Sequence, residues 1–142
     1  IYRRRETELY TSVGVLAAED RIVSAARTQV IPAVSAEVYQ AVEDAYQQAN
    51  PTRRLDAGQR ELARTFACSE KLVAAGIGPA GAGKTTAMRV AADAVRASGG
   101  RVIGLGPSAR AATELSAGLE APAFSLHDWL GARERLHQGK RV

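Results

Sequence analysis

The segment 78–85 has the sequence Gly78-Pro79-Ala80-Gly81-Ala82-Gly83-Lys84-Thr85, which matches the pattern G-x-x-x-x-G-K-[ST]. Small residues let the backbone curve closely around a phosphate, and successive N–H groups then form an anion-binding nest. A helix that starts at such a loop adds the partial positive charge of its N-terminus. The pattern therefore predicts a phosphate-binding loop (P-loop), with Lys84 on the β- and γ-phosphates and the Thr85 hydroxyl on Mg²⁺.

The flanking sequence predicts strand, helix and strand. Residues 72–77 form an apolar run of strand length, a helix is expected from Lys84 to about Ser98, and 102–105 is a second apolar run. The pair Gly99-Gly100 is expected to end the helix. This order is typical of a βαβ unit, so we expect an α/β fold with a parallel sheet.

The first half of the chain has helical patterns. We expect helices over about 11–28 and 35–49, followed by a linker at 50–54. The predicted division is a helical linker or appendage over 1–50 and the P-loop domain over 51–142.

Capping signals mark three further helices. Asp56 and Gln59 have capping-box spacing, and Ser108 is a candidate N-cap of a helix that stops near Gly118. Phe124 and Trp129 flank Ser125 at the spacing of a hydrophobic staple around an N-cap.

Composition excludes several classes of protein. The net charge of +4 and the pI of about 9.6 suit an anionic partner such as nucleic acid. The single cysteine, Cys68, cannot form a disulfide framework or a zinc site alone, which favours a reducing, cytoplasmic setting. No apolar run has the length of a membrane span. The chain starts at Ile1, so we expect it to be part of a longer protein.

Three segments around the P-loop resemble motifs of superfamily 1 DNA helicases. Residues 55–59, Leu-Asp-Ala-Gly-Gln, resemble the Q motif, whose glutamine contacts adenine. Residues 106–112, Gly-Pro-Ser-Ala-Arg-Ala-Ala, resemble motif Ia, which touches single-stranded DNA. Residues 125–130, Ser-Leu-His-Asp-Trp-Leu, are similar to the T-x-H-x-L-L element of RecD-like helicases.

The order and spacing of the P-loop and these three motifs resemble those in the helicase part of conjugative relaxase–helicases of the TrwC/TraI type. The resemblance covers about residues 10–130. It implies the N-terminal part of a first motor domain with an incomplete RecA-like P-loop NTPase sheet. It implies ATP, Mg²⁺, single-stranded DNA and the rest of the parent chain as partners. Lys84 and Thr85 are the expected catalytic residues, and Thr85 the expected Mg²⁺ ligand. The other expected nucleotide contacts are Gln59, Gly78, Pro79, Ala80, Gly81, Ala82, Gly83 and Thr86, and the expected DNA contacts are Pro107, Ser108, Arg110 and His127.

The sequence departs from this family pattern in two respects. The acidic Walker B pair that orients the attacking water is not found, so the chain should bind Mg-ATP but hydrolyse it poorly alone. The three-histidine metal site of relaxases is also missing, since His127 and His137 are the only histidines.

Simpler interpretations remain open for single residues and for the whole chain. The capping box explains Gln59 without a nucleotide, and Arg110 fits a solvated first helical turn. Trp129 fits a staple as well as a base-stacking residue. For the whole chain, the alternatives are a small-molecule P-loop kinase and a non-catalytic interaction module.

Overall fold

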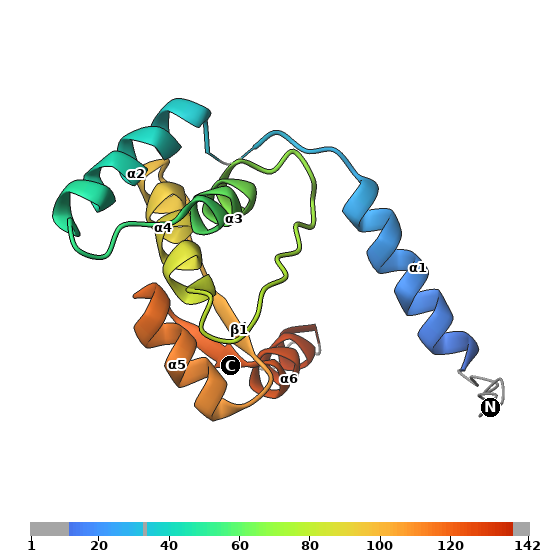
Figure 1. Cartoon of the computed structure of the whole chain (residues 1–142). Helices are drawn as coiled ribbons and strands as arrows, with labels where there is room; N and C mark the ends of the chain where they lie inside the picture. Colours follow the sequence, from blue (N-terminus) through green and yellow to red (C-terminus); the bar gives the residue numbers. More distant parts are fainter. Residues whose placement is uncertain (1–11, 33, 138–142) are drawn as a thin grey trace, which may run out of the picture.

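The computed structural model describes residues 12–32 and 34–137. Its helices are α1 (Val13–Arg27), α2 (Ala36–Ala49), α3 (Ala57–Cys68), α4 (Lys84–Ala97), α5 (Ala109–Leu119) and α6 (Leu126–His137). Its strands are β1 (Gly104–Gly106) and β2 (Ala123–Ser125), which pair in parallel. The architecture is α/β with a preceding helical segment, as the sequence predicts (Figure 1).

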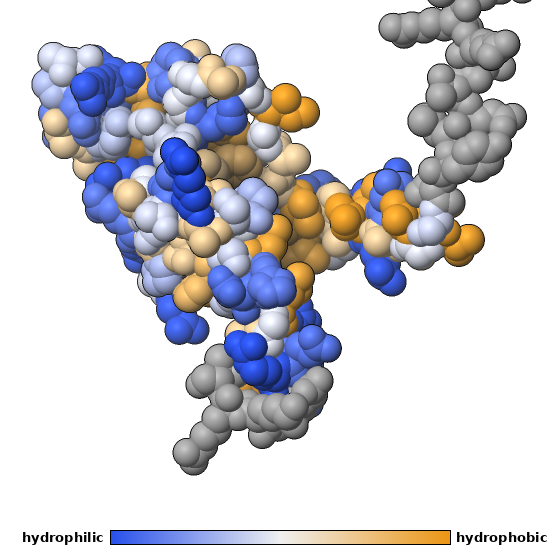
Figure 2. All heavy atoms as spheres, turned by 90° about the horizontal axis from the view of Figure 1, so that it is seen from below, coloured by the Kyte–Doolittle hydropathy of each residue, from blue (hydrophilic) through white to orange (hydrophobic). Residues whose placement is uncertain are grey.

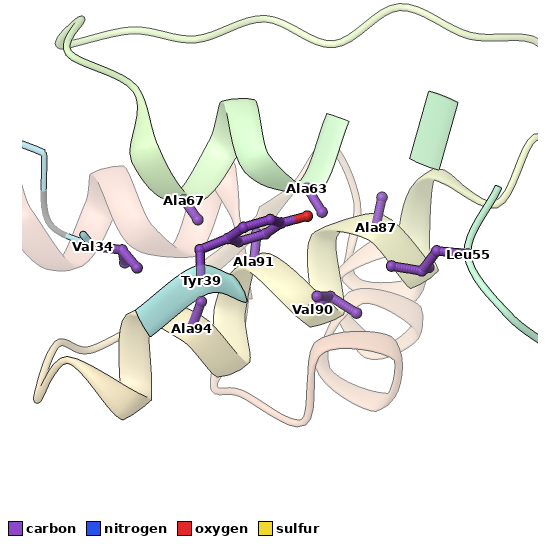
Figure 3. Packing of buried hydrophobic residues seen from close by; sticks show 9 residues of the cluster. All are labelled: Val34, Tyr39, Leu55, Ala63, Ala67, Ala87, Val90, Ala91 and Ala94. Carbon is purple, nitrogen blue, oxygen red and sulfur yellow. The ribbon is translucent and has the colours of Figure 1, made fainter. Parts of the chain in front are cut away.

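Helix α4 lies at the centre of the molecule and contacts α2, α3 and α5. The buried core around it consists mainly of alanine and valine side chains, with Leu55 and the ring of Tyr39, which is inserted from α2 between α3 and α4 (Figure 3). Alanine lets helix axes approach closely, since there is little side chain to keep them apart. The buried members are Val34, Tyr39, Leu55, Ala63, Ala67, Ala87, Val90, Ala91 and Ala94.

Local capping explains where the helices begin and end. Ser35 and Ser108 accept hydrogen bonds from the backbone N–H groups of Val38 and Ala111, at 3.3 and 3.2 Å. Helix α4 ends at Ala97, and the predicted stop signal follows at Gly99, whose φ of 79° lies in the left-handed region that favours glycine. These signals act within one turn, so they could be recognised in the sequence.

The sheet differs from the prediction. Residues 72–77 do not form a strand, and the side chain of Ile77 is fully exposed. The predicted strand at 102–105 is found at Gly104–Gly106. Because 72–77 supplies no first strand, the predicted βαβ unit through α4 is wrong. The βαβ unit that forms is β1–α5–β2, with Gly104 opposite Ala123 and Gly106 opposite Ser125. A strand exists only where a partner supplies hydrogen bonds, and an apolar run does not specify its partner.

The N-cap and staple predicted around Ser125 are confirmed. The Ser125 hydroxyl accepts the Asp128 N–H at 3.1 Å and donates to the Asp128 carboxylate at 2.6 Å. The rings of Phe124 and Trp129 lie 5.8 Å apart between centroids. Phe124 and Ser125 also belong to strand β2, which the sequence analysis did not anticipate.

Helix α1 projects from the rest of the molecule (Figure 1). It contacts no other described helix or strand, and Figure 2 shows apolar side chains exposed on it. Among the described residues, none of the helices has the length and apolar character needed to span a bilayer. Helix α2, in contrast, shares its core with α3 and α4. The domain division after residue 50 stays a prediction.

Candidate functional site

The P-loop connects the extended segment 72–77 to the start of α4. Gly81 and Gly83 have φ values of 78° and 72°, a region in which a side chain is strained. The Ala82 N–H donates to the Pro79 carbonyl at 3.3 Å, which closes a turn. The loop is therefore shaped by glycine at Gly83, which the pattern specifies, and at Gly81, which occupies one of its variable positions.

The N-terminus of α4 is open to an anion. Its N-cap is Gly83, which has no side chain to accept a hydrogen bond. Within the described part of the chain, no group accepts from the backbone N–H of Lys84, Thr85 or Thr86. Unpaired donors at a helix N-terminus favour a phosphate or carboxylate oxygen.

The Lys84 ammonium lies over the loop itself. Its Nζ donates to the carbonyl oxygens of Gly78 and Pro79, at 2.7 Å each. The side chain is thus folded back onto the loop that precedes its own helix. The charge is thus held on the same loop that leads into the open N-terminus of α4, so both would attract a polyanion bound there.

Gln59 joins helix α3 to the P-loop. Its Oε1 accepts the Asp56 N–H at 3.1 Å, and its own N–H donates to Asp56 Oδ1 at 2.8 Å, so the predicted capping box is confirmed. Its Nε2 also donates to the Ala82 carbonyl at 3.2 Å. A Cβ added to Gly83 would lie 2.1 Å from Nε2. The Gln59 amide therefore occupies the space that a side chain at position 83 would fill, a contact that the sequence did not reveal.

A cleft of about 480 Å³ lies between α3 and the loop. It brings together the predicted nucleotide contacts Gln59, Gly78, Pro79, Ala82 and Lys84. Ala80 and Gly81 are exposed and do not line it. Its wall also includes Leu62 and Ile77, which give it an apolar side suited to a flat ring.

Thr85 and Thr86 face a different hollow. They line a space of about 640 Å³ between α2, α4 and α5, together with Gly118 and Arg89. Thr85 is exposed there and does not line the cleft that contains Lys84. Sequence reasoning treated Gly118 only as a helix end, and no sequence signal indicates its proximity to Thr85.

The residues predicted to touch DNA lie at one edge of the sheet. Pro107 and Ser108 follow β1, and His127 follows β2 by two residues. Because Gly106 pairs with Ser125 in a parallel sheet, both segments leave the same edge. Arg110 has a side chain that is 91% exposed and pairs with Glu114 at 3.1 Å. Ser108 caps α5, as the sequence predicts.

The donor set fits a nucleotide with its magnesium ion. The described residues contain no group of three or more side chains that could hold a metal. Mg²⁺ is usually held by one or two protein oxygens together with substrate phosphates. Lys84 with the open N–H groups suits the phosphates. Thr85 lies in the same first turn of α4 and could supply one hydroxyl ligand, but it lines the hollow between α2, α4 and α5 and not the cleft of Lys84.

A family model described as AAA domain matches residues 54–142, which is more than half of the chain and includes α3, the loop, α4 and the sheet. A search of curated proteins and a search of solved structures each found no match.

Proposed function

Since the chain belongs to the AAA domain family, we propose that it is the ATP-binding portion of a DNA helicase or translocase that acts on single-stranded DNA. The family consists of P-loop NTPases, which agrees with an incomplete RecA-like α/β fold and supports a nucleotide site in this chain. The parent protein that we propose is a conjugative relaxase–helicase, on the resemblance of the helicase-like motifs.

The observation that carries the nucleotide site is the convergence of Lys84, the open N-terminus of α4 and Gln59 on one loop. The ammonium and the N–H groups supply positive charge, and the adjoining cleft offers an apolar wall. In this proposal Lys84 binds the β- and γ-phosphates, and Thr85 holds Mg²⁺. The metal would neutralise charge on the phosphates when bound.

The hydrogen bonds of Gln59 leave room for adenine. An amide side chain has two N–H donors and an acceptor with two lone pairs. The structure uses one donor on Ala82 and one lone pair on the Asp56 N–H. The remaining donor and lone pair could bind the edge of adenine without breaking the capping box.

We expect the chain to bind Mg-ATP and to hydrolyse it poorly on its own. Hydrolysis in this class requires a carboxylate that holds the metal and orients water. Within the described residues no acidic side chain lines the cleft except Asp56 and Glu61, which belong to α3 and its cap. Asp56 is already engaged by the Gln59 N–H.

The DNA contacts that we propose are Pro107, Ser108, Arg110 and His127. Their shared sheet edge supports the proposal, because ligands of α/β sheets bind outside the carboxyl ends of the strands. Arg110 provides an exposed positive charge beside the N-terminus of α5, where a DNA phosphate would be favoured.

Helix α1 has features of a segment that attaches the P-loop domain to the rest of the parent protein. It exposes apolar residues, Val13 and Ile22 among them, and nothing in the described structure covers them. We propose that this helix packs against another part of the parent protein.

The first test is calorimetric titration of the chain with Mg-ATP. Lys84→Ala should weaken binding about tenfold or more, since it removes a charged hydrogen bond to phosphate. Lys71→Ala is the matched control, because Lys71 is exposed and lies outside the cleft. Equal affinity of both variants, or no binding by the wild type, would contradict a nucleotide site.

The DNA part has its own test. Fluorescence anisotropy of a labelled single-stranded oligonucleotide should show weaker binding by Arg110→Ala than by the wild type, with the difference shrinking as salt is raised. Arg135→Ala, on the exposed end of α6, is the control. Identical behaviour of the two variants would argue against the proposed DNA edge.

A further inference from the structure

Gly118 of α5 lies directly against Thr85, the proposed magnesium ligand. A Cβ built on Gly118 would be 2.4 Å from Thr85 Cγ2. Real Cβ atoms essentially never approach a heavy atom within 3.0 Å. The absence of a side chain at position 118 therefore lets α5 pass beside the first turn of α4.

Helix α5 is held in this place on two sides. On the sheet side, a Cβ on Gly106 would lie 2.8 Å from the Ala112 backbone nitrogen, so the strand and the helix are in close contact. On the α4 side, Arg96 donates to the carbonyls of Leu119 and Glu120. Arg89 forms an ion pair with Glu120 at 2.6 Å. The end of α5 next to Gly118 is thus fastened to the helix that carries Thr85.

A side chain at position 118 would act on the Thr85 hydroxyl. The methyl and hydroxyl groups of threonine share one Cβ, so rotation that moves the methyl moves the hydroxyl by the same angle. β-Branched side chains have few allowed χ1 positions in a helix. With α5 fastened, a methyl group at 118 would displace Thr85 from its rotamer.

We propose that Gly118 is a positioning residue, which sets the rotamer of Thr85 and through it the magnesium dependence of nucleotide binding. This inference rests on the proposed function, in which Thr85 is a ligand of the nucleotide-bound metal. Gly118 itself touches neither nucleotide nor metal. It would act as residues around metal sites do when they orient a ligand without binding the metal themselves.

The experiment measures the dissociation constant of ATP by calorimetry, once with Mg²⁺ and once with EDTA. The magnesium ratio, which is the dissociation constant in EDTA divided by the dissociation constant with Mg²⁺, reports how much the metal strengthens ATP binding. Gly118→Ala should reduce this ratio about tenfold or more, the usual effect of disturbing a residue that orients a metal ligand. The affinity in EDTA should stay near that of the wild type, because the contacts of Lys84 remain.

Gly131→Ala is the matched control. Gly131 also lies within a helix, α6, and a Cβ there would meet its nearest atom, on Arg135, at an ordinary 3.5 Å. Both substitutions raise helix propensity by about 1 kcal/mol. A general effect of replacing a helical glycine would appear in both variants, whereas loss of the magnesium effect should appear only in Gly118→Ala.

A double-mutant cycle with Thr85→Ser identifies the contact responsible. Serine keeps the hydroxyl and lacks the methyl that a side chain at 118 would strike. In the Thr85→Ser background, adding Gly118→Ala should therefore leave the magnesium ratio unchanged. Thr85→Val, which keeps the shape of threonine without its hydroxyl, gives the ratio expected when this residue contributes no ligand.

The outcomes separate the inference from the function on which it rests. No binding by the wild type, or binding indifferent to Lys84→Ala, would reject the nucleotide site. A magnesium ratio of Gly118→Ala equal to that of Gly131→Ala would overturn the positioning role alone. Misfolding of Gly118→Ala that Thr85→Ser does not restore would also overturn it, because the clash would then involve more than one methyl group.

Discussion

At the scale of single residues, Gln59 shows how one side chain can serve a helix and a loop together. Its amide oxygen caps α3 through the Asp56 N–H, and its amide nitrogen holds the Ala82 carbonyl of the P-loop. The capping box was recognisable from the spacing of Asp56 and Gln59. The contact with Ala82 was not, because it joins residues 23 positions apart.

Gln59→Glu should separate these two roles. Glutamate is favoured in a capping box, so α3 should keep its cap, whereas the donor to Ala82 is lost. We expect the midpoint of thermal unfolding to stay near that of the wild type and Mg-ATP binding to weaken about threefold to tenfold, the usual worth of one hydrogen bond. Calorimetry and thermal unfolding monitored by circular dichroism give the two readouts.

Gln59→Ala is the comparison, since it removes both roles. It should weaken binding and also lower the free energy of unfolding by about 0.3–1.5 kcal/mol, the contribution of a cap. Unchanged binding in both variants would show that the Ala82 contact has no influence on the nucleotide site.

At the scale of elements, the sequence predicted helices well and the sheet poorly. Each helix carries its own signals, such as the caps of α2, α3 and α5 and the glycine after α4. The segment 72–77 has the composition of a buried strand, yet only its first residue is paired, where Leu72 donates to Thr28 at 3.1 Å. Strand pairing depends on residues distant in sequence, which no local pattern contains.

The packing of α2 against α3 and α4 depends on Tyr39, whose side chain is almost fully buried. Its hydroxyl donates to the Arg60 carbonyl at 2.9 Å. Burial, followed by the neighbouring Glu43 carboxylate, raises the pKa of the Tyr39 hydroxyl above its ordinary value. The neutral form is therefore favoured in the folded chain.

This pKa shift predicts how stability depends on alkaline pH. Above about pH 10 the unfolded chain ionises this tyrosine while the folded chain keeps it protonated. The stabilisation is thus fully present below pH 10 and is lost above it, by up to about 1.4 kcal/mol per pH unit. Urea unfolding between pH 8.5 and 11 should show a steeper loss in the wild type than in Tyr39→Phe, with Tyr46→Phe as the control. Parallel curves for all three would mean that Tyr39 ionises equally in both states.

At the scale of the whole molecule, one body with a shared core carries the site, and α1 stands apart from it. The body is formed by α2 to α6 with the two strands, and its core begins at Val34. The sequence identified the P-loop and the motif-like segments at the edge of the sheet. It did not show that α2 belongs to the core of α3 and α4, because an amphipathic pattern specifies a buried face but not the partner that covers it.

Deletion of residues 1–27 should therefore leave the body intact. Helix α1 makes no contact with another described element, and a helix of its length is marginal alone in water. The antiparallel bridge between Gln29 and Lys71 is kept in this truncation. We expect the urea midpoint to match that of the full chain, with helical circular dichroism lower only by the share of α1.

Deletion to residue 49 is the contrasting variant. It removes α2, and with it Val34 and Tyr39 from the core, so cooperative unfolding should be lost. A fall in midpoint already on deletion to residue 27 would show that α1 packs on the body in solution. Its exposed apolar residues would then be covered within the chain, and the proposal that they bind another part of the parent protein would be withdrawn.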